Sequence, residues 1–212
     1  MDGRSQVMNH ELIDVAQRAG IMIAGSIIGL PTEDRAEAAS RLWSRGCWVH
    51  ADVVDGSYGQ RSSVGVDEIA RLAQGRGAVD VHLMVDEPAR WIEQLPRGLA
   101  RITIQADRIP ATELQTAIVE ARRHADSVWI AVHRPERPPV ETIAGVSDVD
   151  GVLFVLAPPA VDGHELDPAN LARPGEAVGP HGVDGGVRTD HLPAIAATGA
   201  VYAVSGRGLF ES

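Results

Sequence analysis

Short apolar runs alternate with helix-length amphipathic stretches along the whole chain. Most runs are nearly continuous in valine, isoleucine and leucine, a pattern typical of parallel strands that helices cover on the outside. The runs that predict strands are Ile21–Ile28, Cys47–Val53, Val79–Val85, Arg101–Gln105, Val128–Val132, Gly151–Leu156, Gly182–Asp184 and Val201–Val204. The stretches that predict helices between them are Thr32–Arg45, Val66–Gln74, Pro88–Gln94, Ala111–Ala125 and Leu192–Thr198.

Repeated strand-then-helix units predict right-handed crossovers and a parallel sheet. Eight units in 212 residues fit one compact (β/α)8 TIM barrel, and an open doubly wound sheet is the alternative that periodicity does not exclude. We expect residues 1–212 to form a single domain, with residues 1–19 as an N-terminal extension that carries a helix around His10–Ala19. The chain stops at Ser212, soon after the eighth strand, so we expect a reduced C-terminal helix.

The segment between the sixth and seventh strands breaks this pattern. Its prolines predict a loop with at most a short helix, because proline removes a backbone donor and obstructs helix interiors. These prolines are Pro158, Pro159, Pro168, Pro174 and Pro180.

Composition and charge narrow the class of protein. Hydrophobic residues make up 44% and charged residues 23%, as in ordinary soluble globular proteins. The net charge of −10 repels nucleic acid and anionic membranes, and no stretch approaches the roughly 20 apolar residues of a membrane span. The one cysteine, Cys47, lies in an apolar run and predicts buried packing rather than catalysis. We therefore expect a cytoplasmic protein without nucleic-acid or membrane partners.

All 19 basic residues are arginine, and the chain has no lysine. This absence excludes Schiff-base chemistry, a lysine general base and the lysine of a P-loop. It also argues against a phosphate-binding decarboxylase on the same barrel, which would use a lysine beside paired aspartates.

Ionisable residues stand at the ends of three predicted strands. Side chains alternate along a strand, so His50 and Asp52 lie on the same face of their strand. Asp80, His82 and Met84 likewise lie on one face of the next strand. Asp184 ends a third strand, and barrel active sites form at such carboxyl ends.

Two histidines and two aspartates placed in this way suit one divalent metal ion, such as Zn²⁺, Fe²⁺, Mn²⁺ or Co²⁺. Each residue alone also fits a hydrogen-bonded interior polar group. Four convergent ionisable groups, however, need mutual compensation, because an unpaired buried charge is costly. Together they predict a metal centre rather than four separate packing residues.

At these residues the sequence resembles the ribulose-phosphate 3-epimerases. The motifs that carry the resemblance keep the family's order from about residue 20 to the end. They are Ser26-Ile27-Ile28, His50-Ala51-Asp52-Val53-Val54-Asp55-Gly56, His82-Leu83-Met84-Val85, Val183-Asp184-Gly185-Gly186-Val187 and Val204-Ser205-Gly206-Arg207-Gly208-Leu209-Phe210. The resemblance implies an isomerase of carbohydrate metabolism on a ribulose-phosphate-binding barrel, and it is consistent with a homo-oligomer.

The resemblance also implies roles for particular residues. The metal ligands would be His50, Asp52, His82 and Asp184. Asp52 and Asp184 would act as the two acid/base catalysts that invert C3 of a phosphorylated ketose, such as ribulose 5-phosphate, through an enediolate. Ser26, His82 and Met84 would contact the substrate beside the reacting carbons.

The phosphate end of the substrate must use backbone amides or arginine, since lysine is absent. Gly185 and Gly186 follow the seventh strand, where many barrels cradle phosphate, and Ser205, Gly206 and Arg207 follow the eighth. Glycines that only serve tight turns are the alternative.

The chain departs from the family pattern around the substrate. The stretch 158–165 keeps only Pro159 and Gly163 of the loop that usually covers the substrate. Gln105 stands where histidine is common, and His133, a possible substrate contact, where asparagine is common. These changes leave the predicted metal ligands and acid/base residues in place. They extend the range of candidate substrates to a tetrulose or hexulose phosphate. A non-catalytic sugar-phosphate sensor on the same barrel is the alternative function.

Overall fold

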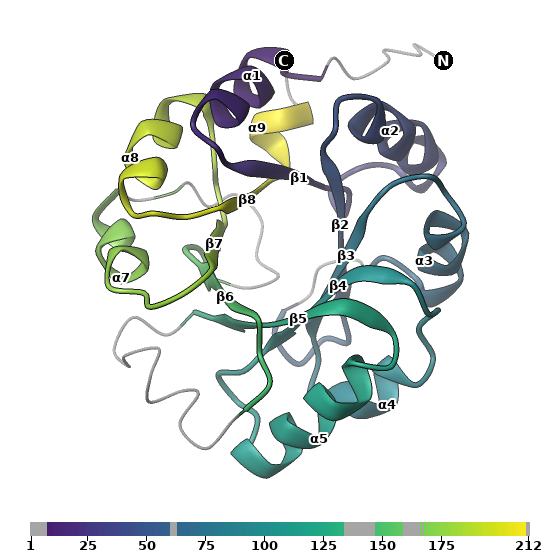
Figure 1. The fold of residues 1–212 in the computed structure, drawn as a ribbon. Helices are drawn as coiled ribbons and strands as arrows, with labels where there is room; N and C mark the ends of the chain where they lie inside the picture. Colours follow the sequence, from purple (N-terminus) through teal and green to yellow (C-terminus); the bar gives the residue numbers. More distant parts are fainter. Residues whose placement is uncertain (1–7, 60–62, 134–146, 159–165, 167, 211–212) are drawn as a thin grey trace.

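The computed structural model describes residues 8–59, 63–133, 147–158, 166 and 168–210. Eight parallel strands pair in sequence order, and β1 pairs with β8 to close the sheet into a barrel (Figure 1). The strands are β1 Met22–Ser26, β2 Trp48–Val54, β3 Val79–Met84, β4 Leu99–Gln105, β5 Ala125–Val132, β6 Gly151–Val155, β7 His181–Asp184 and β8 Tyr202–Ser205. The predicted (β/α)8 TIM barrel is confirmed, and the open sheet is excluded.

Helices surround the barrel in an outer ring (Figure 1). Each predicted helix is present within a few residues of its expected ends. The α-helices are α1 His10–Arg18, α2 Thr32–Ser44, α3 Val66–Ala73, α4 Pro88–Ile92, α5 Ala111–Ala121, α7 Ala172–Gly175, α8 Leu192–Ala197 and α9 Arg207–Phe210. Short 3-10 helices cover Pro168–Leu171 and Thr189–His191. None of the helices in this part of the chain is long and apolar enough to cross a membrane.

Two predicted boundaries were wrong by three residues or more. The helix expected to reach Ala125 ends at Ala121, and β5 begins at Ala125 rather than Val128. Pairing with β4 explains the difference, because Leu99 lies opposite Ala125 and its amide donates to the His124 carbonyl at 3.0 Å.

The first and last helices that the structure describes, α1 and α9, meet at one seam of the barrel. The last helix, α9, has four residues, and α1 lies beside it in the outer ring (Figure 1). Asn9 caps α1 by accepting from the Leu12 amide at 3.1 Å, and its own amide donates to the Leu209 carbonyl at 2.8 Å. The N-terminal helix therefore fills the part of the helical layer that the reduced C-terminal helix leaves open.

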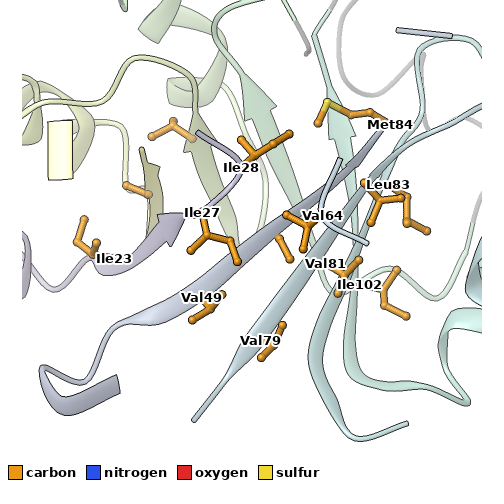
Figure 2. Close-up of a cluster of buried hydrophobic side chains, with 14 of the residues drawn as sticks. Ile23, Ile27, Ile28, Val49, Val64, Val79, Val81, Leu83, Met84 and Ile102 are labelled. Carbon is orange, nitrogen blue, oxygen red and sulfur yellow. The ribbon is translucent and has the colours of Figure 1, made fainter. Parts of the chain in front are cut away.

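Alternation along the strands separates two buried layers. Side chains such as Val49, Val81 and Leu83 point outward and form the main core beneath the helices (Figure 2). A smaller cluster, which includes Trp129 and Tyr202, is separate from that core. The chemistry-bearing side chains of β2 and β3 alternate with the outward-facing residues, so they point into the barrel.

Cys47 lies in the main core, 3% exposed, in agreement with the predicted packing role. Burial raises the pKa of its thiol from 9.0 to about 11, although Arg45 opposes the change. At pH 8 the fraction of Cys47 present as the reactive thiolate is therefore about 100-fold smaller than for an ordinary cysteine. We expect 5,5′-dithiobis(2-nitrobenzoate) at pH 8 to label the folded protein at least about 100-fold more slowly than the urea-unfolded chain. Equal labelling rates would show that Cys47 is accessible.

Candidate metal centre

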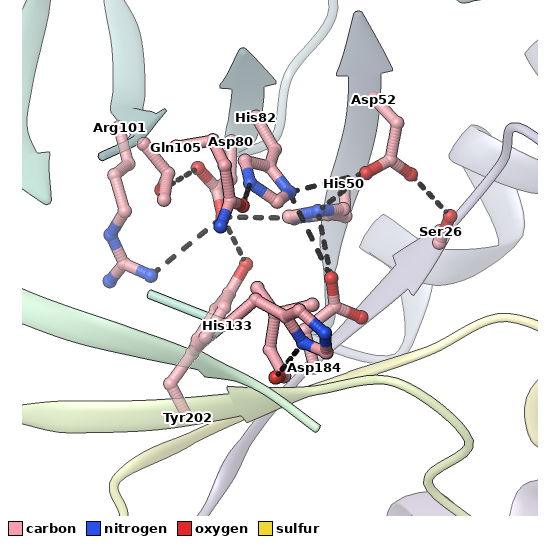
Figure 3. A network of polar contacts seen from close by, with 12 residues as sticks. Ser26, His50, Asp52, Asp80, His82, Arg101, Gln105, His133, Asp184 and Tyr202 are labelled. Atoms are coloured by element: carbon pink, nitrogen blue, oxygen red, sulfur yellow. Dashed lines mark hydrogen bonds and ion pairs between the residues drawn. The ribbon is translucent and has the colours of Figure 1, made fainter. Parts of the chain in front are cut away.

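The candidate metal centre lies inside the barrel, toward the carboxyl ends of β2, β3 and β7 (Figure 3). β2 and β3 pair in a register that places His50 opposite Asp80 and Asp52 opposite His82. Asp184 is the last residue of β7 and approaches from the other side of the barrel. Because side chains alternate along a strand and the residues between the ligands on β2 and β3 pack outward into the core, the fold fixes the direction of these side chains.

The structure brings all four predicted metal ligands together. One ligand atom from each of His50, Asp52, His82 and Asp184 lies within 4.8 Å of the others. Asp52 Oδ1 is 3.2 Å from His50 Nε2 and 3.4 Å from His82 Nδ1. Asp184 Oδ2 is 4.0 Å and 3.8 Å from the same two nitrogens. Two nitrogens and two carboxylate oxygens thus face one point, as a divalent cation of the Zn²⁺ or Mn²⁺ type requires.

The outer nitrogen of each histidine is held by a neighbouring acceptor. His50 Nδ1 lies 3.0 Å from Asp80 Oδ2, and His82 Nε2 lies 3.0 Å from Gln105 Oε1. The inner nitrogens, His50 Nε2 and His82 Nδ1, are buried without a hydrogen-bond partner among the described residues. Both nitrogens approach Asp52 Oδ1 without making a hydrogen bond, and a metal ion between these atoms would satisfy both nitrogens at once. The donor set therefore fits a metal.

The two carboxyl groups of the centre have opposite electrostatic surroundings. Burial alone would raise the pKa of Asp52, but the adjacent His50 and His82 outweigh it and hold that pKa below its ordinary value. Burial raises the pKa of Asp184, and the Asp52 carboxylate raises it further against the opposing effect of His50. Such a pair of carboxyl groups suits a site in which one is ionised while the other holds a proton.

One of the predicted substrate contacts, Ser26, hydrogen-bonds to a residue of this centre, and a second, Met84, lies farther along β3. Ser26, at the end of β1, donates from its hydroxyl to Asp52 Oδ2 at 2.7 Å, which leaves Oδ1 directed toward the histidines. Met84 ends β3, two residues beyond His82 on the same face, and is 4% exposed.

The two predicted phosphate-binding segments are joined to each other, and one of them directly follows the predicted ligand Asp184. Gly185 and Gly186 have φ of +107° and +71°, which L side chains rarely adopt, and a Cβ at Gly185 would lie 2.8 Å from the Ala157 amide nitrogen. The Ser205 hydroxyl donates to the Val187 carbonyl at 2.8 Å and so ties the end of β8 to the loop after β7. Gly206 follows Ser205, and Arg207 begins α9 with an exposed side chain.

Sequence reasoning missed a buried group of polar side chains beneath the centre. Asp80 accepts from the Thr103 hydroxyl at 3.0 Å and from the Tyr202 hydroxyl at 2.7 Å. Arg101 Nη1 lies 3.8 Å from Asp80 Oδ2 (Figure 3). The guanidinium carbon lies 3.7 Å from the centre of the Trp129 ring. Positive charge over aromatic rings and beside a carboxylate compensates its burial. The strict alternation of Arg101, Thr103 and Gln105 was the available signal, since it places three polar side chains on the interior face.

The residues that depart from the family pattern lie around this centre. Gln105 is buried against His82, and the His133 ring contacts the Val155 carbonyl through Nδ1 at 3.0 Å. Whether His133 touches a substrate stays a prediction. Pro159 and Gly163, the two retained positions of the covering loop, lie outside the described residues.

The sequence matches one family over almost this whole region. A sequence model of the ribulose-phosphate 3 epimerase family matches residues 22–210. The chain belongs to this family. Ribulose-phosphate 3-epimerase of Schizosaccharomyces pombe is 27% identical over 211 residues, which cover 93% of this chain and 88% of the relative. The cytoplasmic isoform of the enzyme from Oryza sativa is 25% identical over 209 residues, which cover 92% and 90%.

Solved structures show the same fold outside the ribulose-phosphate 3-epimerase family. A 3-hexulose-6-phosphate synthase aligns with a TM-score of 0.66 at 20% identity, covering 88% of this chain and 90% of the other. Phosphoribosyl anthranilate isomerase from Thermus thermophilus aligns with a TM-score of 0.64 at 16% identity, covering 91% and 90%. At these identities the likeness concerns the barrel alone.

Proposed function

We propose that the protein is a metal-dependent isomerase that epimerises a ketose phosphate at C3. The observation that carries the proposal is the convergence of four ligand atoms within 4.8 Å, two of which are buried histidine nitrogens without hydrogen-bond partners. Membership in the ribulose-phosphate 3-epimerase family supports ribulose 5-phosphate and xylulose 5-phosphate as the substrate pair. Because residues around the centre, such as Gln105 and His133, differ from the family pattern, a related ketose phosphate is the alternative substrate.

The proposed reaction uses the two aspartates as opposed acid and base. Asp52 on β2 and Asp184 on β7 approach the same point from different strands, so they suit the two faces of a substrate carbon held between them. One aspartate, as the carboxylate, removes the C3 proton, and the other, as the carboxylic acid, delivers its proton to the opposite face, which inverts the centre. A bound Zn²⁺, Fe²⁺, Mn²⁺ or Co²⁺ would supply Lewis acidity for the negative charge of the enediolate.

The surrounding residues would hold the substrate in this geometry. The Ser26 hydroxyl fixes the direction of the Asp52 carboxylate through its 2.7 Å hydrogen bond. Met84 would form an apolar wall. The joined loops at Gly185–Gly186 and Ser205–Arg207 would receive the phosphate on backbone amides, with added positive charge from Arg207.

The proposal is tested by hydrogen exchange at C3. The purified protein is loaded separately with each candidate metal and incubated in D₂O with ribulose, xylulose, allulose, fructose and erythrulose phosphates. NMR should show both deuterium at C3 and the second epimer with at least one substrate, and chelation should stop both. Absence of exchange with every substrate at full metal occupancy would overturn the epimerase proposal and favour a non-catalytic sensor.

A further inference from the structure

A chain of hydrogen bonds leads from His82 away from the metal centre. Gln105 Oε1 lies 3.0 Å from His82 Nε2, and the same side chain donates from Nε2 to Asp107 Oδ2. Asp107 also accepts from the His133 backbone amide, at 3.1 Å to Oδ1 and 3.0 Å to Oδ2. His82 and Gln105 are fully buried, so the contact between them is protected from competing water, whereas Asp107 is partly exposed.

The donors and acceptors of these hydrogen bonds fit together in only one arrangement. A carboxylate offers acceptors and no donor, so Asp107 selects the NH₂ group of Gln105. The Gln105 carbonyl oxygen must then face His82, and His82 Nε2 must carry the hydrogen that this oxygen accepts. A neutral imidazole has one N–H, so Nδ1 is left with a free lone pair. That nitrogen is the one that faces Asp52 and Asp184.

We infer that Gln105 and Asp107 form a positioning relay that sets the tautomer of His82 for metal binding through Nδ1. The inference rests on the proposed metal-dependent function. Gln105 acts through His82, and Asp107 acts through Gln105, so neither is a catalytic residue. The relay assigns a function to two residues outside the predicted site.

The second histidine shows why Asp107 is required. His50 Nδ1 contacts the carboxylate of Asp80, which can only accept, so its tautomer is fixed directly. His82 contacts an amide, whose oxygen and nitrogen ends have nearly the same shape. Without Asp107, the Gln105 amide could rotate by 180° and present its NH₂ group to His82. The rotated amide would favour hydrogen on Nδ1 and so block the metal-facing nitrogen.

The direct test is ¹⁵N NMR of the Zn²⁺-loaded protein with labelled histidine. We expect His82 to bind Zn²⁺ through Nδ1 and to keep hydrogen on Nε2, whereas His50 binds through Nε2 and keeps hydrogen on Nδ1. Failure of Zn²⁺ to bind would contradict the proposed function. Zn²⁺ bound to His82 through Nε2 would contradict the relay and leave the metal-dependent function standing.

Four substitutions separate the relay from general structural support. Gln105→Met keeps the side-chain length but offers no acceptor, and we expect Zn²⁺ affinity to fall by about 10–100-fold. Asp107→Leu removes the acceptor that orients Gln105 without touching His82, and we expect about a tenfold loss and mixed His82 signals. Asp107→Asn keeps an oxygen for both donors and should restore affinity to within about threefold of the unmodified protein. Gln94→Met, at an exposed glutamine in the turn after α4, is the matched control.

Circular dichroism verifies that each variant is folded before Zn²⁺ titration. Wild-type affinity and a single Nε2–H signal in both Gln105→Met and Asp107→Leu would overturn the relay. Equal losses in Asp107→Asn and Asp107→Leu would also contradict it, because an asparagine oxygen satisfies the same two donors.

Discussion

Asparagine in place of Asp184 is expected to stop interconversion of the two C3 epimers while one epimer still exchanges its C3 proton with solvent. The reason is that Asp52 approaches from a different strand and keeps its ability to act as a base. A proton removed by Asp52 can be replaced by deuterium on the same face, but no group delivers it to the opposite face. Epimer formation should fall by about 10²–10⁴-fold, the usual contribution of one acid/base catalyst.

The Asp52→Asn variant should show the complementary result, with exchange confined to the other epimer. NMR in D₂O follows both processes, and metal content is measured in each variant because both residues are also proposed ligands. Asp67→Asn, at an exposed position in the first turn of α3, is the control and should keep full activity. Interconversion within tenfold of the unmodified rate in either metal-loaded variant would contradict the two-base mechanism.

The second large effect concerns stability. Asp80→Asn should lower the free energy of unfolding by about 3–5 kcal/mol, because Arg101 would remain buried without its counter-charge. For a chain of this size that corresponds to a fall of roughly 6–20 °C in the unfolding midpoint. Asp80 is fully buried and Arg101 is 6% exposed, so water cannot replace the lost interaction.

The paired substitution Asp80→Asn with Arg101→Met should recover much of this loss, because no charge is then buried without its partner and the asparagine oxygen still accepts from His50 and Tyr202. Glu87→Gln breaks the exposed Glu87–Arg90 pair, 2.8 Å in length, and should cost less than about 1 kcal/mol. Scanning calorimetry measures all four proteins. A midpoint for Asp80→Asn within 2 °C of the unmodified protein would show that the buried charge is compensated elsewhere, a threshold well below the change expected here.

The part of the fold that the sequence predicts follows from the repeated strand-then-helix units. Eight apolar runs with helices between them defined the order of the barrel, but periodicity carries no information on whether the first and last strands pair. The pairing of Met22 with Tyr202 settles this point. Residues 122–125 were misassigned because their local sequence continues a helical pattern, whereas the tertiary pairing with β4 decides the strand boundary.

The site was predictable where spacing within a strand determines the face. His50 with Asp52, and Asp80 with His82, follow the two-residue period directly. The role of Asp80 was not predicted, because its partners come from β4 and β8, far away in sequence. Arg101 is ambiguous in sequence for the same reason. An arginine beside an apolar run is usually placed at the exposed end of a strand. Only the strand register shows that Arg101 is buried beside Asp80 and against Trp129.

The seam between β1 and β8 has a consequence during protein synthesis. About 180 residues separate Met22 from its partner Tyr202. At typical elongation rates of about 5–20 residues per second, β1 leaves the ribosome roughly 10–40 seconds before β8 exists. Throughout that interval β2 is its only neighbour in the sheet, and its other edge is exposed. Closure is therefore one of the last events in the life of the nascent chain, and the five-residue length of β1 limits the edge that must stay unpaired until then.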